Sequence, residues 1–176
     1  MTQVNDRLSV IEGDITALTV DAIVNAANSR LVPGGGVDGA INKAAGPELG
    51  QAMMAVGRCP TGNAVITPGF RLKARHVIHT VAPVYAQHKP DEVWRLLSTC
   101  YRNALTVALQ NDVKSVAFPC LGTGVYGIPN AKACDVAVAT VVAHCNAHAL
   151  PLQVIFCCFG KRDTDLYRAA LADLHG

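Results

Sequence analysis

Short apolar runs alternate along the chain with longer segments in which apolar side chains recur every three or four positions. The first pattern is typical of buried strands and the second of amphipathic helices. Strands are predicted at residues 8–12, 22–26, 62–67, 76–81, 115–119 and 153–159. Helices are predicted at residues 38–45, 48–56, 92–110, 131–148 and 164–174, and Asp91 is predicted to cap the third of them. This alternation indicates an α/β domain whose strands are largely parallel.

One stretch without charged side chains, residues 136–159, is long enough to span a bilayer. It contains His144, Asn146, His148 and Pro151, which do not fit a lipid-exposed helix. We therefore expect the end of a helix, a turn and a buried strand in this stretch. The N-terminus has no apolar segment behind a basic start, so no secretory signal is expected and the cytoplasm is the predicted location.

The composition fits one domain and argues against a nucleic-acid partner. Of the 176 residues, 51% are apolar and 16% are charged, and the net charge is only +2. Soluble domains typically contain about 25% charged residues. Proteins that bind nucleic acid through many phosphate contacts need a basic surface, which this composition does not provide. The seven cysteines show no CxxC spacing, which predicts free thiols in the core and no metal site.

Two glycine-rich segments each follow a predicted strand and precede a predicted helix. The spacing G-x-G-x-x-G occurs in both, at Gly34, Gly36 and Gly39 and at Gly122, Gly124 and Gly127. Such segments are either permissive turns or loops whose backbone N–H groups, next to a helix N-terminus, bind a diphosphate. No acidic residue follows at the distance that NAD-binding folds require, and no Gly-Lys-Ser or Gly-Lys-Thr is present. Hydride transfer and P-loop ATP hydrolysis are therefore not expected.

Four segments in a fixed order resemble the macrodomain family, in its MacroD-like branch, which includes bacterial O-acetyl-ADP-ribose deacetylases. The resemblance runs from about residue 8 to residue 167. The segments are Gly13-Asp14-Ile15-Thr16, Val24-Asn25-Ala26-Ala27-Asn28, Gly34-Gly35-Gly36-Val37-Asp38-Gly39-Ala40-Ile41 and Gly124-Val125-Tyr126-Gly127.

The resemblance implies a single macrodomain over residues 1–176, built as a three-layer α/β/α sandwich around a six-stranded mixed sheet. It implies that ADP-ribose binds in a cleft over the strand ends and that no cofactor is needed. The implied activity is the deacetylation of O-acetyl-ADP-ribose, or the removal of mono-ADP-ribose from acidic side chains of proteins, by attack of water. The alternative is an ADP-ribose reader without catalytic activity, and no membrane partner is expected in either case.

The resemblance also assigns residues to the parts of ADP-ribose. Asp14 would accept a hydrogen bond from the adenine amino group with the Ile15 backbone beside it, although Asp14 also suits a helix N-cap. Phe159 would lie against the adenine, or else be the last core residue of its strand. The distal ribose and its phosphate would be enclosed by Gly34, Gly35, Gly36 and Val37, and the diphosphate by Leu121, Gly122, Thr123, Gly124, Val125 and Tyr126. Tyr126 would pack on the distal ribose.

Asn25, Asn28 and Asp38 are the residues to which the resemblance assigns catalysis. Amides can orient hydroxyl groups or a water, and the Asp38 carboxylate, or a substrate phosphate, can activate that water. Asp38 also suits the first turn of a helix. This chain departs from the branch at three places, because it has Asn42 instead of His, Gly122 instead of Ser and Phe159-Gly160 instead of Tyr-Asp. Binding is expected to tolerate these departures better than catalysis.

Overall fold

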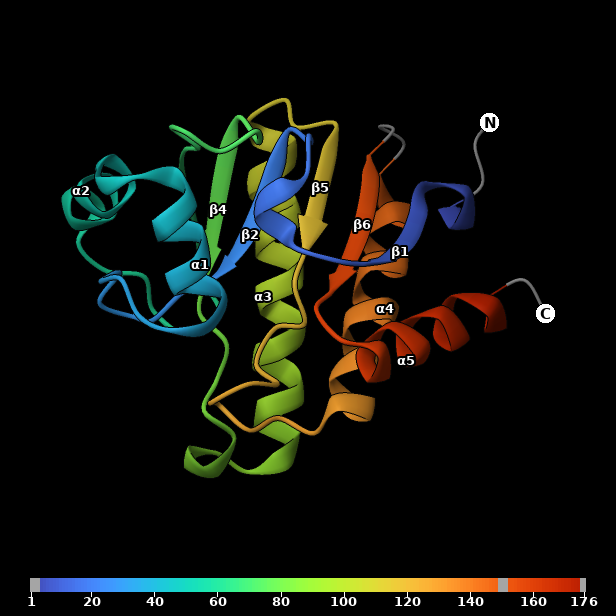
Figure 1. The fold of residues 1–176 in the computed structure, drawn as a ribbon. Coiled ribbons are helices and arrows are strands. Elements are labelled where there is room, and N and C mark those ends of the chain that lie inside the picture. Colours follow the sequence, from blue (N-terminus) through green and yellow to red (C-terminus); the bar gives the residue numbers. More distant parts are fainter. Residues whose placement is uncertain (1–3, 149–151, 175–176) are drawn as a thin grey trace.

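A six-stranded mixed sheet forms the centre of the fold (Figure 1), and the computed structural model describes residues 4–148 and 152–174 of the chain. The strands are β1 (Leu8–Glu12), β2 (Ala22–Ala26), β3 (Ala64–Pro68), β4 (His76–Thr80), β5 (Ser115–Phe118) and β6 (Gln153–Cys158). Their order across the sheet is β1-β6-β5-β2-β4-β3. All neighbours are parallel except β3, which pairs with β4 in the antiparallel sense at one edge.

Helices cover both faces of this sheet. The α-helices are α1 (Gly36–Ala45), α2 (Pro47–Val56), α3 (Pro90–Gln110), α4 (Asn130–Ala147) and α5 (Lys161–Asp173). Short 3-10 helices lie at Val4–Arg7, Ile15–Ala17 and Tyr85–Gln87. Helices α1 and α2 pack on one face of the sheet, and α3, α4 and α5 pack on the other. The three-layer mixed α/β architecture implied by the resemblance is therefore confirmed.

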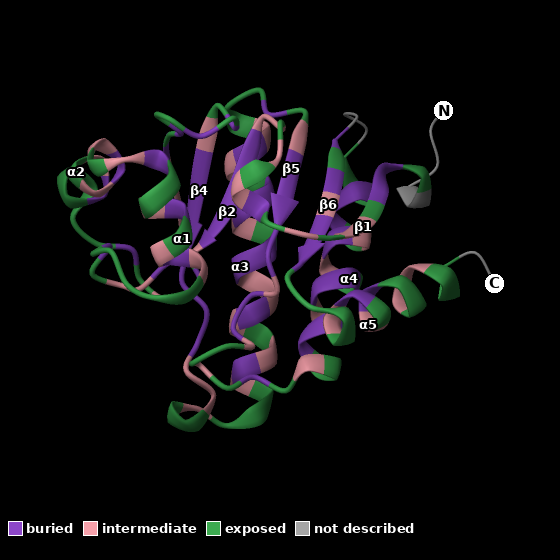
Figure 2. Cartoon of the chain, viewed as in Figure 1, coloured by how far each residue is buried: buried purple, intermediate pink, exposed green. Residues whose placement is uncertain are grey.

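Alternating side chains of the strands fill the two cores. On β2, Val24 points into the core beneath α3 and α4, whereas Ile23 points into the core beneath α1 and α2. On β5, Phe118 and Ala117 divide in the same way. The central strands are therefore largely buried on both sides (Figure 2), which explains why they are continuous apolar runs in the sequence. The polar residues that do occur at strand ends need a partner there.

The predicted elements are all present, with small shifts at their ends. Strand β3 begins at Ala64, two residues later than predicted, because Gly62 turns with a φ of +91° and donates its N–H to the Val81 carbonyl. Helix α1 begins within the glycine run, at Gly36. The prediction that Asp91 caps α3 is wrong. Lys89 is the N-cap, since Pro90 has the fixed φ and the missing N–H that suit the first helical position.

The charge-free stretch is divided as expected between helix and strand. Helix α4 ends at Ala147 and strand β6 begins at Gln153, while the predicted turn between them falls largely on residues 149–151, outside the described residues. Within residues 4–148 and 152–174, no helix is both long and apolar enough to cross a membrane. All seven cysteines are free thiols, and six of them are buried, as predicted.

Candidate functional site

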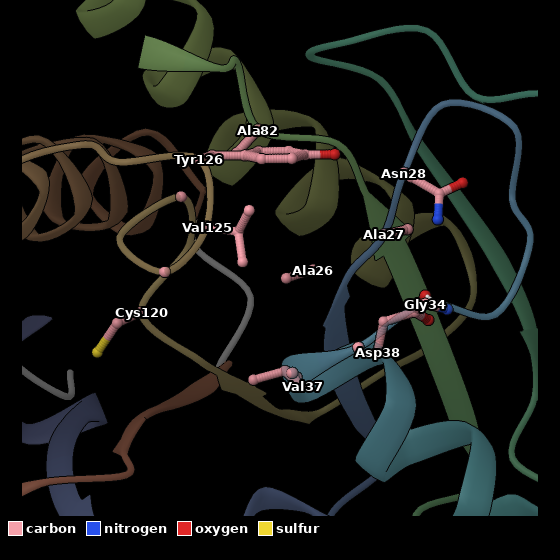
Figure 3. Close-up of a pocket in the computed structure, with 14 residues that line it drawn as sticks. Ala26, Ala27, Asn28, Gly34, Val37, Asp38, Ala82, Cys120, Val125 and Tyr126 are labelled. Atoms are coloured by element: carbon pink, nitrogen blue, oxygen red, sulfur yellow. Dashed lines mark hydrogen bonds between the residues drawn. The ribbon is translucent and has the colours of Figure 1, made fainter. Parts of the chain in front are cut away.

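A cavity of about 340 Å³ lies over the carboxyl ends of the central strands, between the two glycine-rich loops. In an open α/β sheet this is the expected position of a ligand. One wall is formed by Asn28, the glycine run and α1, and the facing wall by the loop that contains Val125 and Tyr126 (Figure 3). The lining residues are Ala26, Ala27, Asn28, Gly34, Gly35, Gly36, Val37, Asp38, Ala82, Cys120, Gly122, Gly124, Val125 and Tyr126.

The N-terminus of α1 supplies positive potential to this cavity. Gly35 is the N-cap and makes no side-chain capping bond, and the Gly36 and Val37 N–H groups lie in the first helical turn. Such N–H groups have no partner within their helix and form the partial positive end of its dipole. No Lys or Arg is found among the described residues of the lining. A bound anion would therefore be held by backbone amides and the helix dipole, as the glycine spacing predicts.

The facing loop is closed by its own backbone bonds. Gly127 N–H donates to the Gly124 carbonyl, and Ile128 N–H donates to the Gly122 carbonyl. Gly122 has a φ of +80°, and a Cβ on this residue would overlap the Ile128 side chain. The lack of a Ser side chain at this position agrees with the local packing, because Ile128 fills the space that such a side chain would occupy. Leu121 is fully buried behind the loop, and the Thr123 hydroxyl donates to the Cys120 carbonyl, so neither side chain forms the cavity wall.

The side chains of Tyr126 and Cys120 differ in their direction relative to the cavity. The Tyr126 ring lies across the cavity with its hydroxyl directed toward the wall that carries Asn28 (Figure 3). The Cys120 sulfur points away from the centre of the cavity. Its hydrogen bond with the Cys158 thiol, together with burial, raises the pKa of the Cys120 thiol. Cys120 is therefore a neutral wall residue at neutral pH and not a nucleophile.

The Asp38 carboxylate is the only acidic group of this lining, and three donors hold it in place. Asn25 Nδ2 and Asn42 Nδ2 donate to Oδ1 over 2.7 and 2.9 Å, and Gly34 N–H donates to Oδ2 over 2.8 Å. Asn42 Nδ2 also lies 2.9 Å from the Asp38 carbonyl oxygen. Asp38 lies in the first turn of α1 and also on the cavity wall. The position at a helix start and the position at the candidate site are therefore compatible.

The two asparagines assigned to catalysis lie in different places. Asn28 lines the cavity, and its amide forms bonds of 2.7 and 3.2 Å with the Val32 backbone, which fixes the loop before the glycine run. Asn25 is fully buried behind Asp38 and does not line the cavity. Its Nδ2 also lies 3.0 Å from His79 Nδ1. Asn25 therefore contacts Asp38 and not the cavity itself.

His79 is an interior, hydrogen-bonded histidine. It is fully buried at the end of β4, and its Nε2 lies 2.9 Å from the Thr67 hydroxyl on β3. Burial lowers the pKa of His79 to about 4, so the imidazole is neutral at neutral pH. The pKa of His144, at the far end of α4, is also lowered to about 4 by burial and by His148.

Asp14, Ile15 and Phe159 lie beyond the cavity, at the neighbouring ends of β1 and β6. The two strand ends are joined by the Gly13 N–H bond to the Cys158 carbonyl, 2.9 Å long. Asp14 caps the short helix Ile15–Ala17, and its Oδ1 accepts bonds from the Thr16 hydroxyl and N–H, which lower the pKa of Asp14. Phe159 is 89% exposed, so its alternative assignment as a core residue is wrong. An exposed aromatic ring near an acidic N-cap residue offers a suitable surface for a nucleobase.

Three comparisons with known proteins bear on this arrangement. The family model described as "Macro domain" matches residues 24–137, which is more than half of the chain. The chain is a macro domain. A macro domain-containing protein of Ralstonia nicotianae is 53% identical over 165 residues, covering 93% of this chain and 94% of that protein. A protein of Escherichia fergusonii named O-acetyl-ADP-ribose deacetylase is 52% identical, covering 94% of this chain and 95% of its own.

Solved macrodomain structures share the fold of this macro domain along nearly its whole length. The Oceanobacillus iheyensis macrodomain with ADP has a TM-score of 0.91 and 41% identity, covering 99% of this chain and 95% of its own. The Trypanosoma brucei macrodomain in complex with ADP-ribose has a TM-score of 0.87 and 39% identity, covering 94% of this chain and 69% of its own. The resemblance inferred from the four sequence segments is thus confirmed.

Several residues of the macro domain's cavity are not among those assigned from the sequence. Ala82 enters the lining because it follows the end of β4, a strand whose outgoing segment has no glycine or acidic residue to mark it. Cys120 has the same position after β5, where the only signal is that it precedes a glycine loop. Both positions follow from the general rule that ligands bind at the carboxyl ends of parallel strands.

Gly39→Ala is expected to weaken ADP-ribose binding by about tenfold or more, which corresponds to roughly 1.4 kcal/mol. A Cβ at Gly39 would lie 2.7 Å from the Gly34 backbone carbonyl, so the glycine run must move away from α1. Gly50→Ala is the matched control, because Gly50 is also inside a helix and its Cβ would make only ordinary contacts, the closest at 3.4 Å. Calorimetry on both variants checks this, and equal affinities would contradict it.

Proposed function

We propose that this macro domain binds ADP-ribose and hydrolyses O-acetyl-ADP-ribose, releasing acetate, and that it also removes mono-ADP-ribose from acidic side chains of proteins. The observation that favours this function is the Asp38 carboxylate, fixed by three donors on the wall of a cavity whose lining also contains Asn28, Tyr126, apolar groups and backbone amides. Relatives about half identical to this chain are named O-acetyl-ADP-ribose deacetylase.

The ligand would extend along the strand ends. The adenine would lie at the ends of β1 and β6, against Phe159 and within reach of Asp14 and the Ile15 backbone. The diphosphate would lie between the N-terminus of α1 and the loop from Gly122 to Tyr126, where backbone N–H groups compensate its charge. The distal ribose would then meet Asn28, Asp38 and the Tyr126 ring.

The reaction breaks the ester bond between the acetyl carbon and the ribose oxygen. A water oxygen attacks the acetyl carbon, the ribose oxygen leaves with a proton, and the products are ADP-ribose and acetate. Asp38 orients the attacking water, and the water's proton passes to Asp38 or to a substrate phosphate. Backbone N–H groups of the glycine run and the α1 terminus stabilise charge that develops on the oxygens. Loss of ADP-ribose from an acidic side chain requires the same groups at the same ribose.

Turnover separates a hydrolase from a reader. Purified protein is mixed with O-acetyl-ADP-ribose, and free acetate and ADP-ribose are followed with time, while calorimetry measures the affinity for ADP-ribose. Equal release of both products together with binding is the expected result. Binding without release identifies the protein as a reader, and absence of binding contradicts the proposed site.

Mono-ADP-ribosylated proteins as substrates, and the cytoplasm as location, stay predictions. The same turnover assay on a protein that carries mono-ADP-ribose on a glutamate or aspartate tests the first. RNA binding that weakens steeply with salt would instead favour a nucleic-acid partner, which the net charge of +2 does not favour.

A further inference from the structure

We infer that His79 and Thr67 are positioning residues of the proposed hydrolase: through Asn25 they fix the orientation in which the Asp38 carboxylate faces the cavity. Neither residue lines the cavity. Both are buried side chains that the proposed reaction does not otherwise use. The inference rests on the proposed function for its effect on turnover, and on the structure alone for its proton arrangement.

The sheet register brings these residues into one row. Asn25 on β2 and His79 on β4 are directly paired. Thr67 lies on the edge strand β3 beside β4, opposite Val77 and therefore diagonal to His79. Side chains alternate along a strand, and Ile23 and Val77, two residues before Asn25 and His79, point into the core beneath α1. Asn25 and His79 therefore point toward α1, where Asp38 lies. The successive distances are 2.9 Å from Thr67 to His79, 3.0 Å from His79 to Asn25 and 2.7 Å from Asn25 to Asp38.

Only one placement of protons satisfies this row. The Asp38 carboxylate can only accept, so Asn25 must present one Nδ2 hydrogen toward Asp38. The second Nδ2 hydrogen is directed at His79 Nδ1, which must therefore be unprotonated. A neutral imidazole then carries its proton on Nε2, and this N–H donates to the Thr67 hydroxyl oxygen. Burial keeps the imidazole neutral at neutral pH, because it lowers the pKa of His79 to about 4.

The opposite arrangement would place two acceptors in contact. If His79 carried its proton on Nδ1, the Asn25 amide would have to turn its Oδ1 toward His79. That turn would set Oδ1 beside Asp38 Oδ1, at the place where a donor now lies 2.7 Å away. Two oxygens without a proton between them repel each other, so the carboxylate would leave its position.

The observed orientation of Asn25 directs both of its amide protons to Asp38 and His79. Among the described residues, no protein group donates a hydrogen bond to the buried Asn25 Oδ1. The amide is therefore oriented by the contacts of its nitrogen and not by a partner of its oxygen.

Two substitutions of His79 separate the two ring nitrogens. The amide of His79→Asn reaches the position of Nδ1, so its oxygen can accept from Asn25. The amide of His79→Gln reaches the position of Nε2, so it retains the contact with Thr67 and leaves Asn25 without an acceptor. We expect His79→Gln to lower kcat for O-acetyl-ADP-ribose by about 10–100-fold, as loss of an orienting partner typically does. KM and the Kd for ADP-ribose should change by less than about threefold, and His79→Asn should recover most of kcat.

Thr67 provides an independent pair of variants on another strand. Thr67→Val has nearly the same shape but removes the acceptor for the Nε2 proton, which favours movement of that proton to Nδ1. Thr67→Ser keeps the hydroxyl. We expect Thr67→Val to lower kcat about tenfold or more, with little change in KM, and Thr67→Ser to stay near the wild type. Thermal unfolding of each variant shows whether any loss of kcat comes from loss of the folded state.

The outcomes distinguish this inference from the proposed function. Wild-type protein that binds ADP-ribose without turnover contradicts the proposed function, whereas normal turnover in His79→Gln contradicts the positioning role. Equal losses in both His79 variants would assign His79 a structural role only. Nitrogen-15 NMR of the His79 ring does not depend on turnover. At pH 7 it should show a proton on Nε2 in the wild type and on Nδ1 in Thr67→Val, and a wild-type proton on Nδ1 would overturn the inference.

Discussion

Asp38→Ala is expected to lower kcat for O-acetyl-ADP-ribose by about 10²–10⁴-fold, the range associated with loss of a positioned acid–base group. Asp38 is the only carboxylate among the described residues that line the cavity, so no other acidic side chain of that lining can orient the attacking water. The diphosphate and adenine contacts involve other residues. The Kd for ADP-ribose should therefore rise by less than about tenfold, and acetate release together with calorimetry measures the two effects separately.

Asp38→Asn serves as the second variant, and it should not restore activity. The carboxylate accepts from Asn25, Asn42 and the Gly34 N–H through its two oxygens. An amide at this position would turn its NH₂ group toward at least one of these donors, whichever way it is oriented. A carboxamide that retained more than about a tenth of the wild-type kcat would show that the charge of Asp38 is not needed, and that a substrate phosphate serves as base.

The fold could be predicted from the sequence because the central strands are buried on both faces. A central parallel strand leaves no solvent face to interrupt its apolar run, so β2 begins and ends at the residues predicted from the pattern. The edge strand β3 was predicted less accurately. The turn at Gly62 delays its start, and it ends at Pro68, a residue that edge strands tolerate.

The site was predictable where its chemistry lies in the backbone. The two glycine loops have a spacing that can be read directly, and they do form the two walls of the cavity. The distinction between Asn25 and Asn28 could not be read in this way. Asn25 lies within β2 and Asn28 lies two residues after its end. Only the folded structure shows that the Asn25 side chain is directed at α1 and that Asn28 lines the cavity.

The row from Thr67 to Asp38 depends on tertiary register. Its members come from three strands and one helix, and no local spacing relates Thr67 to His79 or His79 to Asn25. The sequence indicates only that a histidine inside an apolar strand needs hydrogen-bond partners. Likewise, Asn42 lies one turn after Asp38, which predicts proximity, while its donation to Asp38 Oδ1 is evident only from the structure. Asn42 orients the carboxylate and cannot exchange a proton near neutral pH.

The sparse charge of the chain fits the way the cavity is built. A diphosphate could be held by lysines and arginines, but the described lining contains neither. Amide donors at the start of α1 provide the positive potential instead and leave Asp38 without a nearby cation in that lining. The carboxylate therefore depends on neutral donors for its position. This dependence makes the orientation of Asn25, and of the residues behind it, important for turnover.

His79→Asn is expected to change the acid sensitivity of folding by about 3 kcal/mol, because the pKa of His79 is about 4 when folded and 6.5 when unfolded. Between these values the unfolded chain binds a proton that the folded chain excludes, so the free energy of unfolding falls as the pH falls from 6.5 to 4. Above pH 6.5 the histidine is neutral in both states and adds no pH dependence. The variant lacks this titration. His144, whose pKa is also about 4, lowers the free energy of unfolding of both proteins in the same pH window.

Urea unfolding of the two proteins at several pH values between 7 and 4 measures this effect. At pH 7 the variant should be the less stable protein, since it has lost the hydrogen bond between His79 and Thr67. The free energy of unfolding of the wild type should then fall by about 3 kcal/mol relative to that of the variant as the pH approaches 4, and the contribution of His144 cancels in that comparison. A difference that stays constant with pH would mean that His79 titrates alike in the folded and unfolded chains. In that case burial would not exclude its proton, and the imidazole would not be held in the neutral form that accepts from Asn25.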